Sequence, residues 1–373
     1  MKTIINAKII TQEEVLEGYA LTFDERIVSL SQDVPDHTEL IDAQGLYLSA
    51  GFIDIHIHGS NGHDVMDGTV EALDGIAKSI LQTGTTSFLA TTMTMSAEEI
   101  DKALLNVKNF EGKGNAKILG VHLEGPFINA IKQGAQNPQH IQKPNRQLIE
   151  AYMDIVKMIT IAPEVEGGRE FVEYISKKYP HILLSIGHSD ASYHECKESF
   201  SWGVSHATHL FNAMNPLHHR EPGIVGAVLQ ADEVSCDVIA DLVHIHSSFF
   251  KLLHKLKKEQ LILITDAMRA GCLHEGVSEI GGQKVLVKEG EARLEDGTLA
   301  GSVLKLNEAL KNFYEHTEIG LPALIAMVTS IPAKKLKLNK GIIEKGFEAD
   351  LVLFDEAFKV SEVYVDGNIV FKR

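Results

Sequence analysis

Cysteine, long apolar runs and positive charge are all scarce in this 373-residue sequence, and each shortage excludes a class of protein. The three cysteines, Cys196, Cys236 and Cys272, form no CxxC pair, so they offer no disulfide framework and fit a reducing compartment with inert thiols. No stretch reaches the roughly 18 to 20 apolar residues of a membrane span. The N-terminal MKTIINAKIITQEEV becomes polar too early for a secretory signal. We therefore expect a cytoplasmic protein without a membrane partner.

The shortage of positive charge bears on possible partners. The chain has 35 Lys and Arg residues against 51 Asp and Glu residues, a formal net charge of −16 with histidine neutral. Because clustered Lys and Arg hold a phosphate backbone, this balance argues against a nucleic-acid partner. Hydrophobic residues make up 44% of the chain and charged residues 23%, a composition that builds a large core and excludes a disordered chain.

Histidine, in contrast, is abundant. The chain has 18 histidines, and 16 of them lie between His56 and His274. Imidazole is the commonest metal ligand in proteins and the side chain that titrates nearest to neutral pH. The positions of these histidines in the fold therefore decide what chemistry the chain can perform.

Short apolar runs alternate with amphipathic helical stretches from residue 51 onward, which predicts repeated β/α units. One helix start is Ser96, a predicted N-cap followed by acidic residues. Eight such units predict a closed (β/α)8 barrel, a TIM-type α/β fold. The predicted strands cover residues 51–59, 86–91, 117–125, 158–164, 183–189, 205–212, 235–241 and 261–267.

The two ends of the chain have a different pattern. Residues 1–50 and 340–373 hold short β-type runs separated by turn signals, such as TIINAKII and ADLVLFD. We predict that both termini pair into one small, discontinuous β-sandwich domain. It would lie beside a barrel domain formed by residues 51–339.

The first predicted barrel strand, GFIDIHIHG, carries two histidines on one face. Side chains alternate between the faces of a strand, so Asp54, His56 and His58 share one face and three isoleucines share the other. With the isoleucines against the helices, the histidines face inward at the carboxyl-terminal mouth, where barrel enzymes build active sites. Two imidazoles at i and i+2 can bind one cation, although packing alone also produces this pattern. The position just before Gly59 favours a metal site.

Four more predicted strands end in or carry a ligand-type residue. Taken singly, each of these residues could be a hydrogen-bonded core group or a helix cap. Together they bring ligand-type groups from five strands to one rim, which favours a metal centre. His122 is interpreted as a core or supporting residue, and His206, which points away from the rim, as structural. The four rim residues are Glu124, His188, His209 and Asp266.

Seven motifs carry a resemblance to a known family. They resemble the metal-dependent amidohydrolase superfamily and, within it, the N-acetylglucosamine-6-phosphate deacetylase family. The resemblance implies that Glu124, His188 and His209 bind a metal ion common to all members, and that His56 and His58 bind a second ion present in some. It thus implies one or two divalent ions per subunit, Zn2+ or Fe2+, and a homodimer. The motifs are GFIDIHIHG, HLEGPFIN, IGHSDA, THLFNAMNP, ADLVHIH, LITDAM and LAGS, spread over residues 51–302.

The activity that the resemblance implies is deacetylation of N-acetylglucosamine 6-phosphate to glucosamine 6-phosphate and acetate, in amino-sugar catabolism and cell-wall sugar recycling. Metal-activated water would attack the amide, with Asp266 as general base and then general acid. The net charge of −16 does not oppose an anionic substrate. Screening over about 8 Å lets a local basic pocket act independently of distant charge.

The resemblance also implies a substrate pocket. Asn212 and Ala213 match a substrate-contacting pair, and Arg220 and His244 match phosphate ligands, Arg for its fork of donors. The LAGS segment, with Leu299, Ala300 and Gly301, matches a lid over the sugar. The roles of the two neighbours of Arg220 stay open between a mobile polar loop and substrate binding; they are His218 and His219.

One position departs from the family pattern. Where some members have a histidine, this chain has Gln136, after Gly134 and Ala135. A glutamine can donate a hydrogen bond to the sugar or to the acetyl oxygen, but it cannot titrate near neutral pH. We therefore predict that Ala135 and Gln136 bind substrate and that Asp266 alone transfers the proton.

Two alternatives stand beside this prediction. Another amidohydrolase, such as an amino-acid deacylase or a cyclic-amide hydrolase, is disfavoured by the presence of Asn212, Arg220 and His244. The fourth strand, MITIAPE, has no lysine that could be carboxylated, as in dihydroorotase-like relatives, and adenosine-deaminase-like relatives lack the EGP turn. A non-catalytic barrel that serves as a binding module is disfavoured because the set of ligand-type residues is intact.

Overall fold

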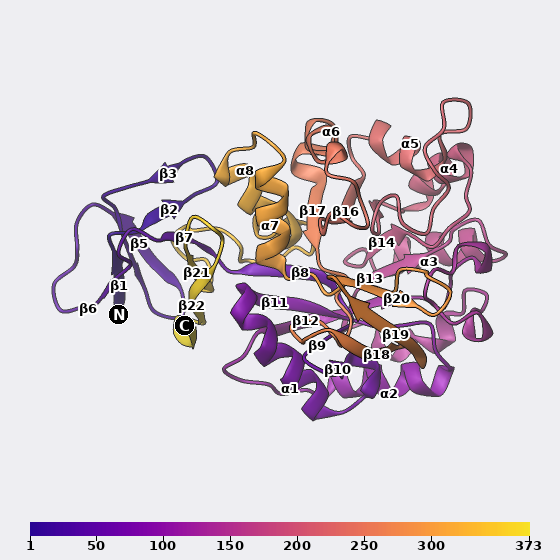
Figure 1. Cartoon of the computed structure of the whole chain (residues 1–373), viewed down its shortest axis with the longest axis horizontal. Helices are drawn as coiled ribbons and strands as arrows, with labels where there is room; N and C mark the ends of the chain where they lie inside the picture. Colours follow the sequence, from indigo (N-terminus) through magenta and orange to yellow (C-terminus); the bar gives the residue numbers. More distant parts are fainter.

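The centre of the fold is a parallel eight-stranded barrel, which fills the right-hand part of Figure 1. A computed structural model describes residues 1–373. The strands follow the order β17-β16-β15-β14-β13-β12-β11-β8. The ring closes where Ile57 pairs with Ala267 and where the Asp266 N–H donates to the His56 carbonyl at 2.9 Å. In chain order the strands are β8 (Phe52–Ile57), β11 (Thr85–Thr91), β12 (Lys117–Glu124), β13 (Val156–Ile161), β14 (Leu183–Ile186), β15 (His206–Ala207), β16 (Ser235–Ile239) and β17 (Leu261–Ile264).

The predicted barrel is therefore confirmed, with one notable difference in strand length. The predicted strand at 205–212 is reduced to the two residues of β15. The chain leaves the extended conformation soon afterwards, because His209 and Phe211 have φ angles of 33° and 83°. This early turn places the side chains that follow β15 at the mouth of the barrel.

Helices surround the barrel and cover the apolar outer faces of its strands. Ser96 caps α2 as predicted: its hydroxyl accepts from the Glu99 N–H, and the Glu99 carboxylate accepts from the Ser96 N–H. Such a cap contributes about 1 kcal/mol. None of the helices combines the length and apolar content that a membrane crossing needs. The helices are α1 (Val70–Ser79), α2 (Ala97–Lys108), α3 (Gly168–Lys178), α4 (Tyr193–Trp202), α5 (Gly223–Gln230), α6 (Ser248–Lys257), α7 (Leu306–Glu315), α8 (Leu321–Ala326) and α9 (Ser330–Lys335). Short 3-10 turns are η1 (Val65–Asp67), η2 (Ile80–Thr83), η3 (Ala130–Lys132), η4 (Pro138–His140), η5 (Arg146–Leu148), η6 (Glu150–Tyr152) and η7 (Lys258–Gln260).

Both termini contribute strands to two further sheets, which we call the terminal sheets and which lie at the left of Figure 1. One has the order β5-β4-β1-β6 and the other β23-β22-β21-β7-β2-β3. The ends of the chain meet where β21 pairs antiparallel with β7, Leu353 opposite Leu48. Their strands are β1 (Lys2–Ile5), β2 (Lys8–Ile10), β3 (Val15–Leu16), β4 (Ala20–Phe23), β5 (Ile27–Ser31), β6 (Glu39–Asp42), β7 (Tyr47–Ala50), β21 (Leu351–Phe354), β22 (Val360–Val365) and β23 (Asn368–Lys372).

The six-stranded terminal sheet is covered on both faces. In β21, Leu351 and Leu353 pack into the apolar cluster between the two terminal sheets. The alternate residues Val352 and Phe354 pack into the large core of the barrel. This alternation explains why the LVLF of ADLVLFD is a continuous apolar run, since a strand buried on both faces has no polar side. The terminal sheets are thus packed firmly against the barrel.

A three-stranded sheet, which we call the lid sheet, was not predicted from the sequence. It consists of β18 (Gly276–Ile280), β19 (Gln283–Lys288) and β20 (Glu291–Leu294), drawn in orange in front of the barrel in Figure 1. Val285 and Val287 pack with Met93 and Met268 in a separate apolar cluster. The Gln283 side chain donates to the Ala135 carbonyl at 2.6 Å, so the lid sheet is tied to the loop after β12. A two-stranded ribbon, β9 (Gly59–Ser60) and β10 (His63–Asp64), follows β8.

A buried charge network joins the terminal sheets to the barrel. The ammonium group of Lys340 lies 2.7 Å from the Asp350 carboxylate, and both residues are only 3% exposed. Lys340 also donates to the Ser87 hydroxyl of β11 at 2.5 Å. Lys117, the first residue of β12, lies 2.8 Å from Glu348 and 3.2 Å from Asp350. The network therefore anchors the starts of two barrel strands.

Replacing Lys340 with methionine should lower the free energy of unfolding by about 3 kcal/mol, because it leaves buried carboxylates without one of their two cations. Urea unfolding followed by circular dichroism measures the change. The matched control is Lys251→Met, which breaks an exposed pair with Glu318 and should change stability by less than about 1 kcal/mol. Equal effects of the two substitutions would show that the network contributes no more than a surface ion pair.

Candidate active site and metal centre

Six side chains converge at the carboxyl-terminal mouth of the barrel. His56 and His58 come from β8, and Glu124 is the last residue of β12. The other three, His188, His209 and Asp266, follow the ends of β14, β15 and β17. All six residues are buried, with at most 8% of their surface exposed. The structure thus brings together every residue that the sequence predicts for metal binding and proton transfer.

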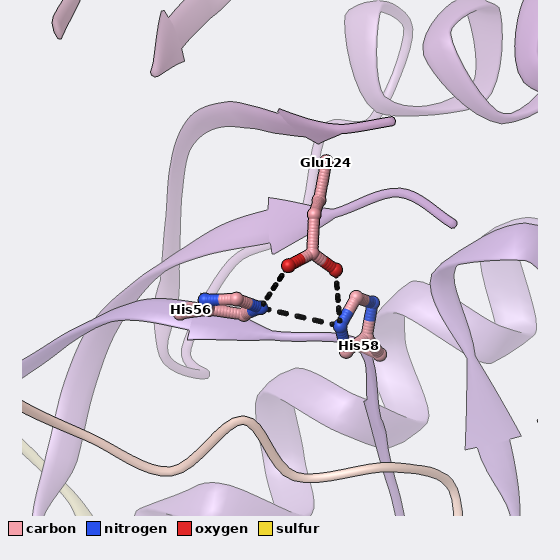
Figure 2. Close-up of side chains that lie close together, drawn as sticks. All are labelled: His56, His58 and Glu124. Carbon is pink, nitrogen blue, oxygen red and sulfur yellow. Dashed lines mark hydrogen bonds and ion pairs between the residues drawn. The ribbon is translucent and has the colours of Figure 1, made fainter. Parts of the chain in front are cut away.

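The Glu124 carboxylate lies at the centre of this cluster, and Figure 2 shows it pointing from its strand onto the rings of His56 and His58. Its Oε1 atom is 3.4 Å from His56 Nε2, 3.3 Å from His188 Nε2 and 3.2 Å from His209 Nε2. Its Oε2 atom is 3.2 Å from His58 Nε2. One carboxylate therefore contacts four imidazoles.

The separations between these donor atoms fit a metal ion. Zn–N bonds of 2.0–2.1 Å in a tetrahedral site place two ligand atoms about 3.3 Å apart. The Nε2 atoms of His188 and His209 are 3.1 Å apart, and those of His56 and His58 are 3.3 Å apart. The donors fall into two sets that share Glu124, one with His56 and His58 and one with His188 and His209. Imidazole and carboxylate are ligands that Zn2+ and Fe2+ both accept.

The surroundings of the rings support this fit. His188 places its Nδ1 atom 2.9 Å from the Lys132 carbonyl, which makes Nδ1 the donor and leaves the Nε2 lone pair facing the cluster. The Nδ1 atoms of His56, His58 and His209 are buried without a partner. A bound cation would hold these three rings through Nε2 alone.

The charges in the cluster favour the binding of a cation. Burial lowers the pKa of His209, but the hydrogen bond and charge of Glu124 outweigh it and raise the pKa to about 9. Burial raises the pKa of Glu124, but His56 and its neighbours hold that pKa well below its usual value. Burial likewise raises the pKa of Asp266, and His56 and His58 lower it below its usual value. Both carboxyl groups are therefore ionised and attract a cation.

Three of the six residues have left-handed backbone conformations. The φ angles are 48° at His188, 33° at His209 and 49° at Asp266. Such a conformation costs about 1–3 kcal/mol for a residue other than glycine and is concentrated at functional sites. Each strained residue lies just after a barrel strand, where the turn directs its side chain to the common centre.

Other buried polar residues hold the cluster in place. The ring of His122 lies edge-on to His56 at 4.6 Å, and its Nε2 is 2.7 Å from the Thr160 hydroxyl. Burial lowers the pKa of His122 well below its usual value, so the ring is neutral. His206 lies between Ser235 and Asp237, at 2.7 and 2.9 Å. These contacts agree with the supporting and structural interpretations of the two histidines.

Asp54, on the same face of β8, is hydrogen-bonded to the residue that follows the neighbouring strand β17. Its Oδ2 atom accepts from the Thr265 hydroxyl at 2.6 Å. This bond fixes the position of Thr265, which directly precedes Asp266.

A cavity of about 340 Å3 opens onto the cluster and is lined by all of the six converging side chains except His56. It is also lined by most of the residues predicted to bind substrate: Ala135, Gln136, Asn212, Ala213, His244, Leu299 and Gly301. The Nδ1 atom of His244 lies 2.6 Å from the Asp241 carboxylate, so the opposite edge of the ring is free. A larger hollow of about 630 Å3 lies beside α6 and α8 and contains none of the predicted site residues.

Two residues predicted to bind substrate do not line this cavity. Ala300 is fully buried within the apolar cluster of the lid sheet. Arg220 is exposed, and its guanidinium lies 2.8 Å from His219 Nε2. His218 and His219 are exposed on the same loop. The phosphate role of Arg220 therefore stays a prediction.

Arg293, the one Lys or Arg that lines the cavity, was not predicted from the sequence. It belongs to β20 of the lid sheet. Its guanidinium donates to the Glu291 carboxylate at 2.6 Å and to the Gly297 carbonyl at 2.7 Å. Thr298, directly before the LAGS segment, was also missed. Arg293 has no motif around it, whereas Thr298 could have been found by extending LAGS by one residue.

A parallel β/α barrel with histidine and carboxylate donors at the carboxyl ends of its strands defines a metal-dependent barrel hydrolase. The chain belongs to the amidohydrolase family, whose sequence model matches residues 47–370. This family is metal-dependent, which agrees with the donor sets described above. The family predicted from the motifs is confirmed.

Similar proteins cover almost the whole chain. N-acetylglucosamine-6-phosphate deacetylase of Lysinibacillus sphaericus is 38% identical over 93% of this chain and 91% of its own length. The enzyme of the same name from Bacillus subtilis (strain 168) is 38% identical over 97% of this chain and 95% of its own. The crystal structure of N-acetylglucosamine-6-phosphate deacetylase from Pasteurella multocida matches with a TM-score of 0.94 and 31% sequence identity. The match covers 100% of this chain and 100% of that chain.

Replacing His209 with alanine should weaken Zn2+ binding by more than about 100-fold. This loss would exceed the loss of metal affinity that is typical when a residue hydrogen-bonded to a metal ligand is replaced. Equilibrium dialysis followed by elemental analysis measures the bound zinc. The rise in melting temperature on zinc addition should be lost in parallel, because the ion stabilises only a folded chain that binds it. The control is His246→Ala, an exposed histidine outside the cavity that should bind zinc normally. Unchanged zinc binding by His209→Ala would exclude His209 as a ligand.

Proposed function

We propose that this protein hydrolyses the 2-acetamido group of N-acetylglucosamine 6-phosphate to give glucosamine 6-phosphate and acetate. The observation that carries the proposal is the cavity in which Asp266 and all of the donor residues except His56 share one space with Asn212, Ala213 and His244. The relatives at 38% identity bear the name of this activity and match nearly all of the chain.

The metal positions are proposed from the two donor sets. Glu124, His188 and His209 would hold one ion, and His56 and His58 would hold a second with Glu124 as the shared ligand. When bound, a divalent cation such as Zn2+ or Fe2+ lowers the pKa of water and polarises the amide carbonyl. The protein's part is to keep the donors in place and the carboxylates ionised.

Asp266 is the proposed proton carrier. Its Oδ1 atom lies 3.2 Å from His58 Nε2 and borders the cavity, where it can reach the attacking water and the departing nitrogen. Its main chain is held on both sides, by the His56 carbonyl at 2.9 Å and the Ser302 N–H at 2.7 Å. Asp266 takes the proton of the water and returns it to the amine, which cannot leave as an anion.

The rest of the cavity is proposed to bind the sugar phosphate. Asn212 supplies an amide, Ala213 its main chain, and Leu299 and Gly301 cover the sugar from the side of the lid sheet. His244, oriented by Asp241, is proposed to contact the phosphate. The predicted Arg220 and the cavity-lining Arg293 are two candidates for the guanidinium that completes this contact.

The assembly, domain division and location are proposals of the same kind. Two exposed leucines, Leu217 and Leu242, support a homodimer because they offer apolar surface on the loops that carry Arg220 and His244. The terminal sheets support a division into a β-sandwich domain, residues 1–50 and 340–373, and a barrel domain between them. Three free cysteines support a cytoplasmic location, and burial raises the pKa of Cys196 and Cys236 to about 12.

The zinc-loaded wild type should release acetate from N-acetylglucosamine 6-phosphate, and Asp266→Asn should lose several orders of magnitude in kcat. The amide cannot accept the proton, so turnover is lost. It keeps the shape of the side chain, so zinc content and substrate affinity should be unchanged. Acetate release gives kcat, and equilibrium binding gives the affinity. Asp232→Asn, at an exposed position, serves as the control. Normal turnover by Asp266→Asn would exclude the proton-carrier role, and wild-type activity on N-acyl amino acids alone would favour another amidohydrolase function.

Removing the phosphate contact should raise KM for the phosphorylated sugar far more than KM for N-acetylglucosamine. A charge-assisted hydrogen bond contributes about 1.5–3 kcal/mol, so the selective rise should be roughly 10- to 100-fold. The comparison of His244→Ala, Arg220→Ala and Arg293→Ala assigns the residues that contact the phosphate. Equal effects on both sugars would exclude a phosphate role for the residue replaced.

A further inference from the structure

Gln136 is buried beside the metal ligands, and both ends of its carboxamide are bonded to protein. It is 3% exposed. Its Oε1 atom accepts from the Thr94 main-chain N–H at 2.7 Å. Its Nε2 atom donates to Glu124 Oε2 at 2.8 Å and lies 3.7 Å from the Met93 sulfur. The side chain thus links the loop after β11 to the central carboxylate.

The direction of this link is set by the main chain. The Thr94 N–H can only donate, so it selects the oxygen of the carboxamide and turns the NH2 group toward Glu124. A carboxylate can only accept, so the second contact requires the same orientation. The two bonds therefore support each other and exclude the flipped amide.

The link determines how the Glu124 carboxylate is rotated. The last torsion of a glutamate side chain is broad and nearly two-fold, so a buried carboxylate needs outside contacts to fix its plane. With Oε2 held by Gln136 and next to His58, Oε1 faces the other three imidazoles, those of His56, His188 and His209. The orientation of this one carboxylate thereby presents an oxygen atom to both donor sets.

We propose that Gln136 is a positioning residue that locks the Glu124 carboxylate in the orientation shared by both donor sets. The inference rests on the proposed function only in that the donor sets hold metal. Residues that bond to metal ligands typically contribute 10- to 100-fold in metal affinity. In this arrangement the carboxamide acts through Glu124.

The test is Gln136→Met, which keeps the length and volume of the side chain but removes both hydrogen bonds. Circular dichroism first establishes that the variant is folded. Zinc affinity, measured without substrate against a chromophoric chelator, should fall 10- to 100-fold, while KM at saturating zinc should change less than about threefold. The control is Gln139→Met, because Gln139 is exposed on the same loop and should leave zinc affinity unchanged. If Gln136→Met does not fold, Gln136→Asn, which retains an amide but is too short to reach both partners, takes its place.

Two results would overturn the inference. Unchanged zinc affinity with a KM at least 10-fold higher would make Gln136 a substrate-binding residue instead. Unchanged zinc affinity together with an unchanged KM would show that Gln136 has no role in the site. Since zinc affinity is measured without substrate, an inactive wild type would count against the proposed deacetylation and not against the positioning role.

Discussion

The arrangement of the site depends on one buried carboxylate, that of Glu124. Removing a carboxylate from water costs several kcal/mol unless positive charge and hydrogen-bond donors replace the solvent. Glu124 is 2% exposed and is surrounded by four imidazole nitrogens and the Gln136 amide. A cation between these groups would compensate the charge that the barrel has buried. A bound metal ion would therefore also let the fold tolerate its own central charge.

The strand that carries this carboxylate is fixed at both ends. Lys117 begins β12 and takes part in the charge network with Glu348 and Asp350, while Glu124 ends it. At that end the Glu124 N–H donates to the Thr92 hydroxyl at 3.2 Å. In barrels, the amino-terminal face generally serves stability and the carboxyl-terminal face serves chemistry. Here one strand connects the two, so the terminal sheets help to hold the Glu124 side chain, which lies at the opposite end of the barrel.

The parts of the site that follow from local rules could be predicted from the sequence. Strand alternation placed His56 and His58 together, and the carboxyl ends of strands placed Glu124 and Asp266 at the mouth. The contact between Gln136 and Thr94 could not be predicted, because it joins two loops through a main-chain N–H that no motif marks. Arg293 was missed because the lid sheet is short-stranded and packs on a small cluster of its own, without the period that the barrel strands share.

Both donor sets contain Glu124, and this sharing bears on how many ions the site can hold. The His56–His58 and His188–His209 separations of 3.3 and 3.1 Å each suit the edge of one tetrahedral ion. A single ion bound by all four imidazoles and Glu124 would need five protein ligands and would leave no open position for the reaction, whereas catalytic zinc sites keep one. The two donor sets would avoid this crowding if each held its own ion, since Glu124 offers Oε2 beside His58 and Oε1 beside the other three imidazoles. The barrel therefore offers two candidate donor sets that share one carboxylate, so the orientation of Glu124 bears on both of them.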